Sequence, residues 1–247
     1  MSNRILSFQF IASALLVAIA AHMAWHDPKY LPPLLIIGAL ALAPTFFARR
    51  RVRRILMSGD VDQVLGTWQS SMHRLRHPET MTPLMMATAY ASCGWIAQAR
   101  RALERAVKGP AWDAAIEQRL FIETLLDTFE GDRSAALEKA ASLQSLPVPR
   151  AAGKIARSRI VRMRRAMTAV ARAFAHQPSK GDIAVLRAAS KSSPLIHWAT
   201  RYAAAIIAVD RGDVLAARSL IANAPPWPEE SAFRSFDEEL RARTDTR

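Results

Sequence analysis

The stretch PLMMATAYASCGWIAQARRALERA, residues 83–106, decides the fold. Small and apolar residues recur in it at helical spacing, and no run of alternating β-branched residues interrupts it. Gly94 predicts a turn between two helices, because glycine tolerates the left-handed backbone with which helices often end. Small Ala87 and Ala99 let the two helices approach closely, and Tyr90 fills the space beside them. The stretch therefore predicts a helical hairpin.

From about residue 55 onward the chain continues as helical segments separated by short breaks. Gly59, Gly94 and Gly131 are 35 and 37 residues apart, and Gly181 and Gly212 continue the series less regularly. A period of this length is typical of stacked helical hairpins. We therefore predict an all-α fold, with an α-solenoid of antiparallel helix pairs over residues 55–225. A capping helix and charged tail are expected at 226–247. An ordinary helical bundle with glycine turns is the alternative.

The hairpin at residues 83–106 resembles a tetratricopeptide repeat. Its second helix and its turn both fit the pattern of that family. The positions that match are Met86 and Ala87 at the Leu-Gly pair, Tyr90 at the aromatic position, Gly94 in the turn, and Ala99, Leu103 and Ala106 in the second helix. The resemblance implies a repeat-packing role for Tyr90, Gly94, Ala99 and Leu103. Other units of the chain match less well, since their first helices lack the Leu-Gly-Tyr set.

Two apolar segments precede the helical part. Residues 5–25 contain no Asp, Glu, Lys or Arg, and neither do residues 30–47. A helix needs about 20 residues, with ~17 as the working minimum, to cross the hydrocarbon core of a bilayer. We therefore predict a membrane anchor over residues 1–54 with transmembrane helices at about 5–25 and 30–47. The first segment is either retained or cleaved as a signal peptide.

Five arginines follow the second apolar segment and determine the predicted topology: Arg49, Arg50, Arg51, Arg53 and Arg54. Positive charge beside a membrane span favours the cytoplasmic side. We therefore expect the helical domain on the cytoplasmic face of a bacterial-type inner membrane, behind a basic cytoplasmic flank. This layout is similar to that of the HemY family of bacterial membrane-anchored repeat proteins. No role in haem metabolism is carried over from that similarity.

The net charge of +13 is concentrated in two segments. The arginine cluster is one, and residues 139–181, which contain no Asp or Glu, are the other. Within the second segment, residues 150–175 predict a basic amphipathic helix. Its candidate contact surface consists of Arg157, Arg162, Arg164, Arg165 and Arg172. That surface suits an acidic protein or anionic lipid, or is the solvated face of a core helix. Nucleic acid is disfavoured, since no aromatic platform accompanies the charge.

No combination of residues predicts catalysis. His73 and His77 are one helical turn apart, but only Glu79 stands nearby as a third metal ligand, so a solvated helix face is favoured. Cys93 has no evident activating base. We expect no catalytic, cofactor-binding or metal-binding residues, and a non-enzymatic scaffold or adaptor that binds a protein partner at the membrane. The alternative is a lipid- or envelope-associated regulator that uses helix 150–175 on anionic head groups. An enzyme is the third class of function considered, after the adaptor and the lipid-associated regulator.

Overall fold

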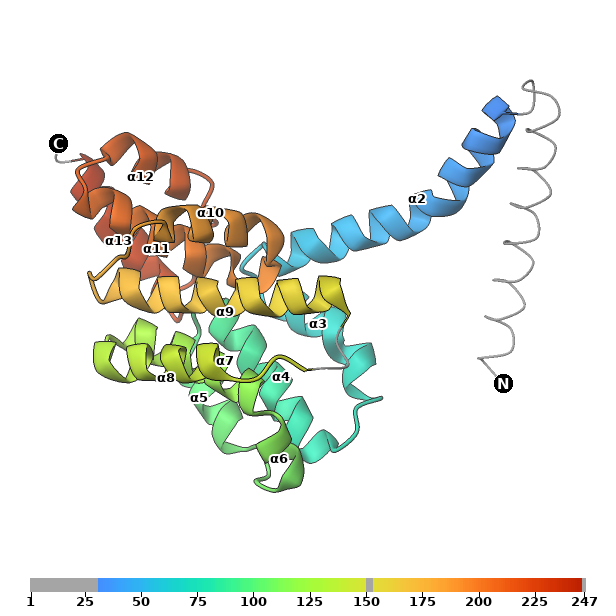
Figure 1. Ribbon diagram of the computed structural model, residues 1–247, viewed down its shortest axis with the longest axis horizontal. Coiled ribbons are helices and arrows are strands. Elements are labelled where there is room, and N and C mark those ends of the chain that lie inside the picture. The colour runs from blue at the N-terminus through green and yellow to red at the C-terminus, as the bar shows by residue number, and fades with distance from the viewer. Residues whose placement is uncertain (1–30, 150–152, 246–247) are drawn as a thin grey trace. The chain divides into compact units, whose positions relative to one another are not determined.

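The computed structural model describes residues 31–149 and 153–245, and every element in these ranges is helical (Figure 1). The predicted all-α class is confirmed for this part of the chain. The chain divides into two compact units, Met1–Val52 and Arg53–Arg247. The helices are α2 (Leu31–Leu56), α3 (Val61–Met72), α4 (Pro78–Ser92), α5 (Ile96–Glu104), α6 (Pro110–Ala114), α7 (Ile116–Glu130), α8 (Arg133–Ser145), α9 (Lys154–Phe174), α10 (Asp182–Ser192), the 3-10 helix η2 (Pro194–Ile196), α11 (His197–Asp210), α12 (Val214–Ile221) and α13 (Ala232–Asp245).

Helix α2 provides the described backbone of the first unit. It runs without interruption through Pro44 and has Arg53 and Arg54 in its last turn. The predicted span at residues 5–25 lies outside the described residues. So do the side chains of residues 33–42, which make up much of the second predicted span. Across residues 31–149 and 153–245, none of the helices combines the length and the apolar character that a membrane crossing requires.

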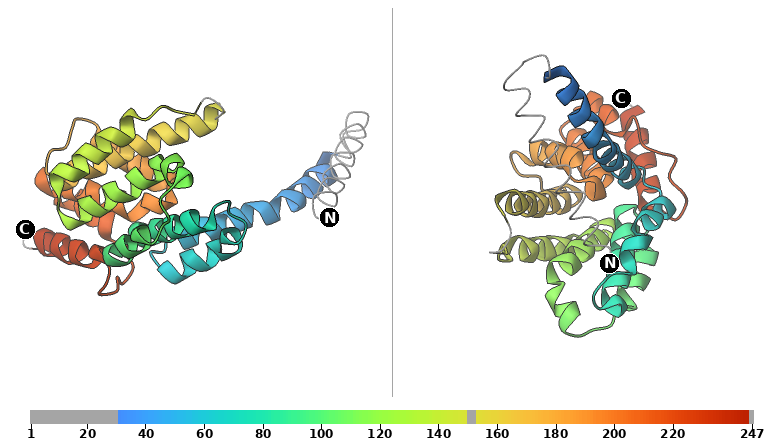
Figure 2. Two further views of the ribbon diagram at one scale, coloured as in Figure 1. Left: turned by 90° about the horizontal axis from the view of Figure 1, so that it is seen from below. Right: turned by 90° about the vertical axis from the view of Figure 1, so that its right-hand side faces the viewer.

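In the second unit, helices that follow one another along the chain pack side by side (Figure 2). Helix α4 packs on α5, α7 on α8, and α11 on α12, while α9 packs on both α8 and α10. Helix α4 also contacts α7, helix α7 contacts α9, and helix α9 contacts α11. The apolar stripe predicted along α9 faces this interior, where Met167 and Val170 are fully buried. The second unit is therefore a stack of successive helices around one large apolar core with three smaller clusters among the described residues.

Gly-Asp turns join several of these helices. Gly131 ends α7 with φ at 85°, in the left-handed region. Asp132 then begins α8, and its carboxylate accepts the backbone N–H of Ala135 at 3.0 Å. The same combination of a left-handed glycine and a capping aspartate recurs at residues 59–63 and 212–216. One short sequence thus both ends a helix and starts the next.

The segment before α13 packs against two of the glycine turns. A Cβ atom on Gly59 would stand 2.4 Å from the ring of Trp227, and one on Gly94 would stand 2.7 Å from Oγ of Ser231. Ser231 also donates a hydrogen bond to the carbonyl of Cys93 at 2.7 Å. Both glycines have φ at 78°, so only glycine fits these turns without strain. The C-terminal segment therefore closes back onto the start of the second unit.

An aromatic cluster completes the connection between α13 and the helix stack. Phe233 is fully buried and stacks on Tyr202, with 5.3 Å between ring centroids. Phe129 lies at 5.2 Å from Phe233 in an edge-on arrangement. Trp227 donates its indole N–H to the hydroxyl of Tyr202 at 2.6 Å, which gives two buried polar groups a partner. In the predicted capping segment 226–247, Trp227 and Phe233 are thus part of the main core.

Candidate functional site

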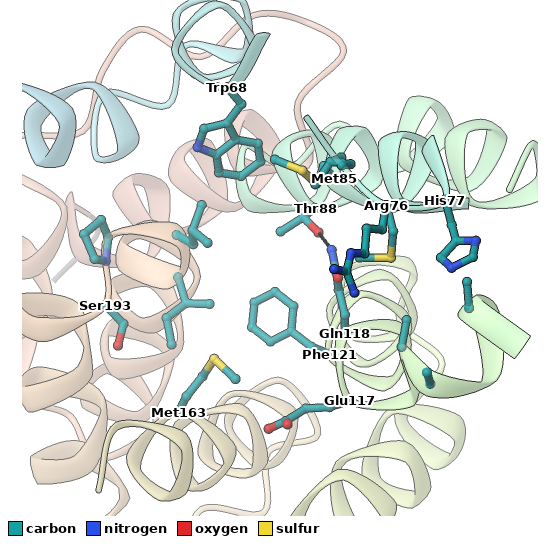
Figure 3. Close-up of a pocket in the computed structure, with 18 residues that line it drawn as sticks. Trp68, Arg76, His77, Met85, Thr88, Glu117, Gln118, Phe121, Met163 and Ser193 are labelled. Atoms are coloured by element: carbon teal, nitrogen blue, oxygen red, sulfur yellow. Dashed lines mark hydrogen bonds between the residues drawn. The ribbon is translucent and has the colours of Figure 1, made fainter. Parts of the chain in front are cut away.

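A cavity of about 830 Å³ lies in the second unit between α3, α4, α6, α7, α9 and η2 (Figure 3). Ligand sites in proteins typically enclose about 300–1,000 Å³, so this cavity has the volume of a small-molecule site. Most of its lining is apolar. The larger apolar side chains in the lining are Trp68, Leu75, Met81, Met85, Phe121, Met163, Leu195 and Ile196.

The lining of the cavity combines buried core residues with half-buried methionines. Phe121 and Ile196 are 5 % and 1 % exposed and belong to the main core. Met81, Met85 and Met163 are half-buried around them. Methionine is unbranched and polarisable, so it adjusts to ligands of irregular or variable shape. The cavity is therefore suited to a flexible apolar ligand.

One side of the cavity in Figure 3 carries Arg76, Thr88 and Gln118, while Glu117 and Ser193 line other parts of it. Gln118 donates its amide N–H to Oγ1 of Thr88 at 3.1 Å, and that hydroxyl donates to the carbonyl of Leu84 at 2.8 Å. Arg76 lines the cavity from the loop between α3 and α4, and Figure 3 shows it beside Gln118. Arg76 is exposed and makes no hydrogen bond or ion pair with any residue that the structure describes. This side of the cavity therefore offers a cation to a ligand.

The carboxylate of Glu117 also lines the cavity, but an arginine neutralises it. Arg164 is 3 % exposed and donates from Nε to Oε1 of Glu117 at 2.9 Å. Its other nitrogens donate to the carbonyls of Leu146 and of Pro147. This arrangement satisfies a buried guanidinium and ties α9 to α7 and to the end of α8. Glu117 therefore contributes no free negative charge to the cavity.

The predicted basic surface is divided by the structure. Arg164 is buried against Glu117, and Arg172 donates from Nε and Nη2 to both carboxylate oxygens of Asp182, at 3.0 and 2.7 Å. Neither guanidinium faces outward to a partner. Ile155 is 72 % exposed in the first turn of α9. The remaining predicted arginines are exposed: Arg157, Arg162 and Arg165.

The residues predicted to pack the hairpin of residues 83–106 meet in the core. Tyr90 stacks on Trp95, with ring centroids 6.2 Å apart and an interplanar angle of 26°. Gly94 adopts the left-handed backbone that the turn was expected to need. Ala99 is fully buried and Leu103 is 9 % exposed. The helices α4 and α5 therefore meet through a left-handed glycine turn with small residues buried beside it.

The predicted topology-determining arginines lie along α2 and are all exposed: Arg49, Arg50, Arg51, Arg53 and Arg54. Arg53 belongs to the second unit and donates to the carbonyl of Lys191 at the end of α10. Just beyond α2, the carbonyl of Met57 accepts the indole N–H of Trp198 at 2.8 Å. The final turn of α2 is therefore fixed within the second unit by contacts with α10 and α11.

The two histidines considered as metal ligands are both exposed. His77 precedes α4 with φ at 55°, and its Nδ1 lies 3.6 Å from the carboxylate of Glu79. His73 follows the last turn of α3. Among the described residues, no group of three or more His, Cys, Asp and Glu side chains is placed to hold a metal ion.

Two buried ionisable groups outside the cavity have structural roles. Burial raises the pKa of the Cys93 thiol to about 11, so the thiol is protonated at neutral pH. Asp127 lies 2.6 Å from a nitrogen of Arg100 and 2.7 Å from that of Lys139, which links α5, α7 and α8. The pKa of Arg100 is raised, chiefly by its hydrogen bond with Glu130. The ion pairs of Asp127 therefore stabilise the packing of these three helices.

The cavity was missed from the sequence, although Met81, Met85 and Met163 stand in its lining. Methionine at helical spacing is also typical of an ordinary core, so the pattern alone does not indicate a hollow. No protein-family model, curated protein or solved structure matches this chain. What the chain does is therefore inferred from its own residues.

Proposed function

We propose that this chain is a membrane-anchored helical-repeat adaptor that binds a protein partner at the cytoplasmic face of a bacterial-type inner membrane. The observation that carries the proposal is the exposed first half of α9. This region, residues 154–162, presents cations around Ile155, which is 72 % exposed. The neighbouring chain from 139 to 181 contains no acidic residue to neutralise it. Such a surface suits a partner with acidic groups around an apolar contact.

The proposed anchor is supported by the apolar segments at residues 5–25 and 30–47 and by the arginines after them. Phe46 and Phe47 are 61 % and 63 % exposed, immediately before this arginine cluster. Aromatic side chains commonly occupy the boundary between hydrocarbon and head groups. With this topology, the second unit lies on the cytoplasmic side.

The proposed repeat character is supported by the packing of successive helices and by the recurring Gly-Asp turns. The hairpin around Gly94 resembles a tetratricopeptide repeat, and the layout of anchor and helical domain resembles the HemY family. Stacked helical hairpins generally act by binding other proteins through extended surfaces. A non-enzymatic adaptor is the function most often built on such a stack.

A second candidate is a regulator that contacts anionic lipid directly through the same region of α9. The exposure of Ile155 among cations favours it, since an apolar side chain enters the head-group region while cations bind lipid phosphates. Each basic residue near an anionic membrane contributes about 1 kcal/mol to such binding. The protein and lipid versions share a surface but differ in what that surface touches.

A photo-cross-linking experiment on the full chain in native membranes separates these two candidates. A benzophenone amino acid replaces Ile155, and the test variant combines Arg157→Glu, Arg159→Glu and Arg162→Glu. The control variant makes the same charge change at three exposed arginines on other helices or turns: Arg105→Glu, Arg133→Glu and Arg211→Glu. We expect a discrete cross-linked protein that is lost in the test variant and kept in the control.

Cross-links to lipid alone would replace the adaptor with the lipid-contact candidate. A protein cross-link that both triple variants retain would contradict the basic surface as the binding site. Circular dichroism of each variant establishes that the helical fold is unchanged.

A further inference from the structure

We propose that the cavity between α3, α4, α6, α7, α9 and η2 binds a long-chain fatty acid. The inference goes beyond the adaptor function and does not depend on it, because the cavity lies within the second unit alone. Its volume of about 830 Å³ lies within the ~300–1,000 Å³ range of sites that enclose small molecules. Protein partners instead bury about 800 Å² per side over a broad surface.

The lining charges select an anionic end group. Glu117 is paired at 2.9 Å with buried Arg164 and is therefore compensated. Arg76 is the permanently charged cation of the lining and has no ion-pair partner in the part of the chain that the structure describes, whereas the imidazole of His77 lies 3.6 Å from the carboxylate of Glu79. A guanidinium binds a carboxylate with two parallel hydrogen bonds. One cation matches the single charge of a carboxylate better than the higher charge of a phosphate.

The distribution of polar and apolar groups selects a chain with a polar end. Arg76, Thr88 and Gln118 lie on one side of the cavity in Figure 3, while Phe121, Met163 and the small side chain of Ser193 lie away from them. A peptide would need hydrogen-bond partners for its backbone along its whole length. A fatty acid needs them only at its carboxylate. Methionine walls also adapt to a flexible chain more readily than to a rigid ring system.

The inference is tested with the full chain in lipid nanodiscs and a palmitate analogue that carries a photoactivatable diazirine near the end of its chain. After illumination, the labelled peptides are identified by mass spectrometry. We expect label on the peptides that contain Met81, Met85 and Met163, competed by unmodified palmitate. Label confined to residues 5–47, with none on the cavity peptides, would overturn the inference.

Two variants test the two parts of the site. Ala114 is an exposed residue that lines the cavity, so Ala114→Trp fills the space from its edge and is expected to abolish labelling there. The control is Ala97→Trp, at an exposed position of α5 outside the cavity. Labelling that persists in Ala114→Trp at the level of the Ala97→Trp control would contradict binding in the cavity.

Arg76→Gln tests the recognition of the carboxylate, with Arg74→Gln as the control at an exposed arginine two residues away. We expect Arg76→Gln to weaken palmitate competition about tenfold, the order for loss of one charge-assisted contact. The corresponding fatty alcohol should compete about tenfold less well than palmitate in the unchanged protein. It should compete as well as palmitate in Arg76→Gln. Equal competition by acid and alcohol in the unchanged protein would overturn the assignment of Arg76, as would displacement by an apolar peptide but not by palmitate.

Discussion

The two halves of α9 contain the same residue types in different surroundings. In the first half, residues 154–162, the cationic side chains are exposed. In the second half, residues 163–174, Arg164 meets Glu117 on α7 and Arg172 meets Asp182 on α10. The same stretch buries Met167 and Val170 completely, so Arg164 and Arg172 lie at the edges of a packed interface, while Arg165 in the same stretch is exposed.

This difference shows that an arginine's role is decided by the element that packs against it. A buried charge is costly unless it has a partner and filled hydrogen bonds. Where a neighbouring helix supplies a carboxylate, the arginine is drawn into the fold. Arg165, which no carboxylate of the described residues pairs with, remains exposed. The comparison therefore predicts large stability effects for the arginines of α9 that meet a carboxylate and small ones for those that stay exposed.

The largest effect is expected for Arg164→Met. The change leaves the carboxylate of Glu117 and the carbonyls of Leu146 and Pro147 without their donor. Removing one partner of a buried ion pair typically costs 3–5 kcal/mol, so we expect a loss of about 3 kcal/mol in unfolding free energy. Thermal unfolding followed by circular dichroism would show a drop of roughly 6–12 °C for a domain of this size.

The matched control is Arg165→Met, one position along the helix and exposed. A surface substitution of this kind is expected to change stability by no more than ~0.5 kcal/mol. If both variants unfold at the same temperature, the contrast between buried and exposed arginines on α9 is wrong.

A smaller effect is expected for Arg172→Met. The side chain of Arg172 is 33 % exposed, and Asp182 keeps a second donor, the backbone N–H of Ser179 at 2.8 Å. Solvent and this remaining bond reduce the penalty to about 1–2 kcal/mol. Lys180→Met, at an exposed position in the same turn, provides the control in the same melting experiment. A loss as large as that of Arg164→Met would mean that partial exposure does not reduce the cost of leaving Asp182 without Arg172.

The sequence was sufficient for the features of this fold that depend on local chemistry. The left-handed turn at Gly94 follows from glycine's lack of a Cβ, and the burial of Met167 and Val170 follows from the apolar stripe of α9. Both signals lie within one or two turns of the chain. They therefore needed no knowledge of which helices become neighbours.

The features that the sequence did not predict depend on residues far apart in the chain. Ser231 meets the carbonyl of Cys93 across 138 positions, and this contact brings the C-terminal segment into the core. The division of the α9 arginines depends on Glu117, which is 47 positions from Arg164. The cavity likewise needs several helices at once, since no single one of them is hollow. Local patterns cannot specify such contacts.

His197 is a buried basic group that no carboxylate of the described residues pairs with, and it provides a contrast to the paired arginines of α9. His197 is 8 % exposed, and its Nδ1 donates to the carbonyl of Ser190 at 2.8 Å. Burial is the main cause that lowers its pKa below the ordinary 6.5, and the charges of Arg201 and Arg53 lower it further. In contrast to Arg164, this group is held neutral in the folded chain.

Stability should therefore fall as the pH drops below about 6.5, because the unfolded chain takes up the proton before the folded chain does. The stabilisation is fully present above the unfolded pKa and is lost as the pH falls through the folded one. His197→Gln keeps a neutral donor for Ser190 and should show a smaller loss of melting temperature between pH 7.5 and pH 5.5. An identical loss in both proteins would show that His197 contributes nothing to the pH dependence.

The smallest effect is expected for Ile155→Ala in the exposed half of α9. Its side chain is 72 % exposed, so truncation should change the unfolding free energy by no more than ~0.5 kcal/mol. Val170→Ala, at a fully buried position of the same helix, should cost about 1–2 kcal/mol because it leaves a void in the core. Urea unfolding of both variants measures the contrast. If Ile155→Ala costs as much as Val170→Ala, the first half of α9 is packed in the folded chain. The exposed basic surface would then lose its basis as a site for another molecule.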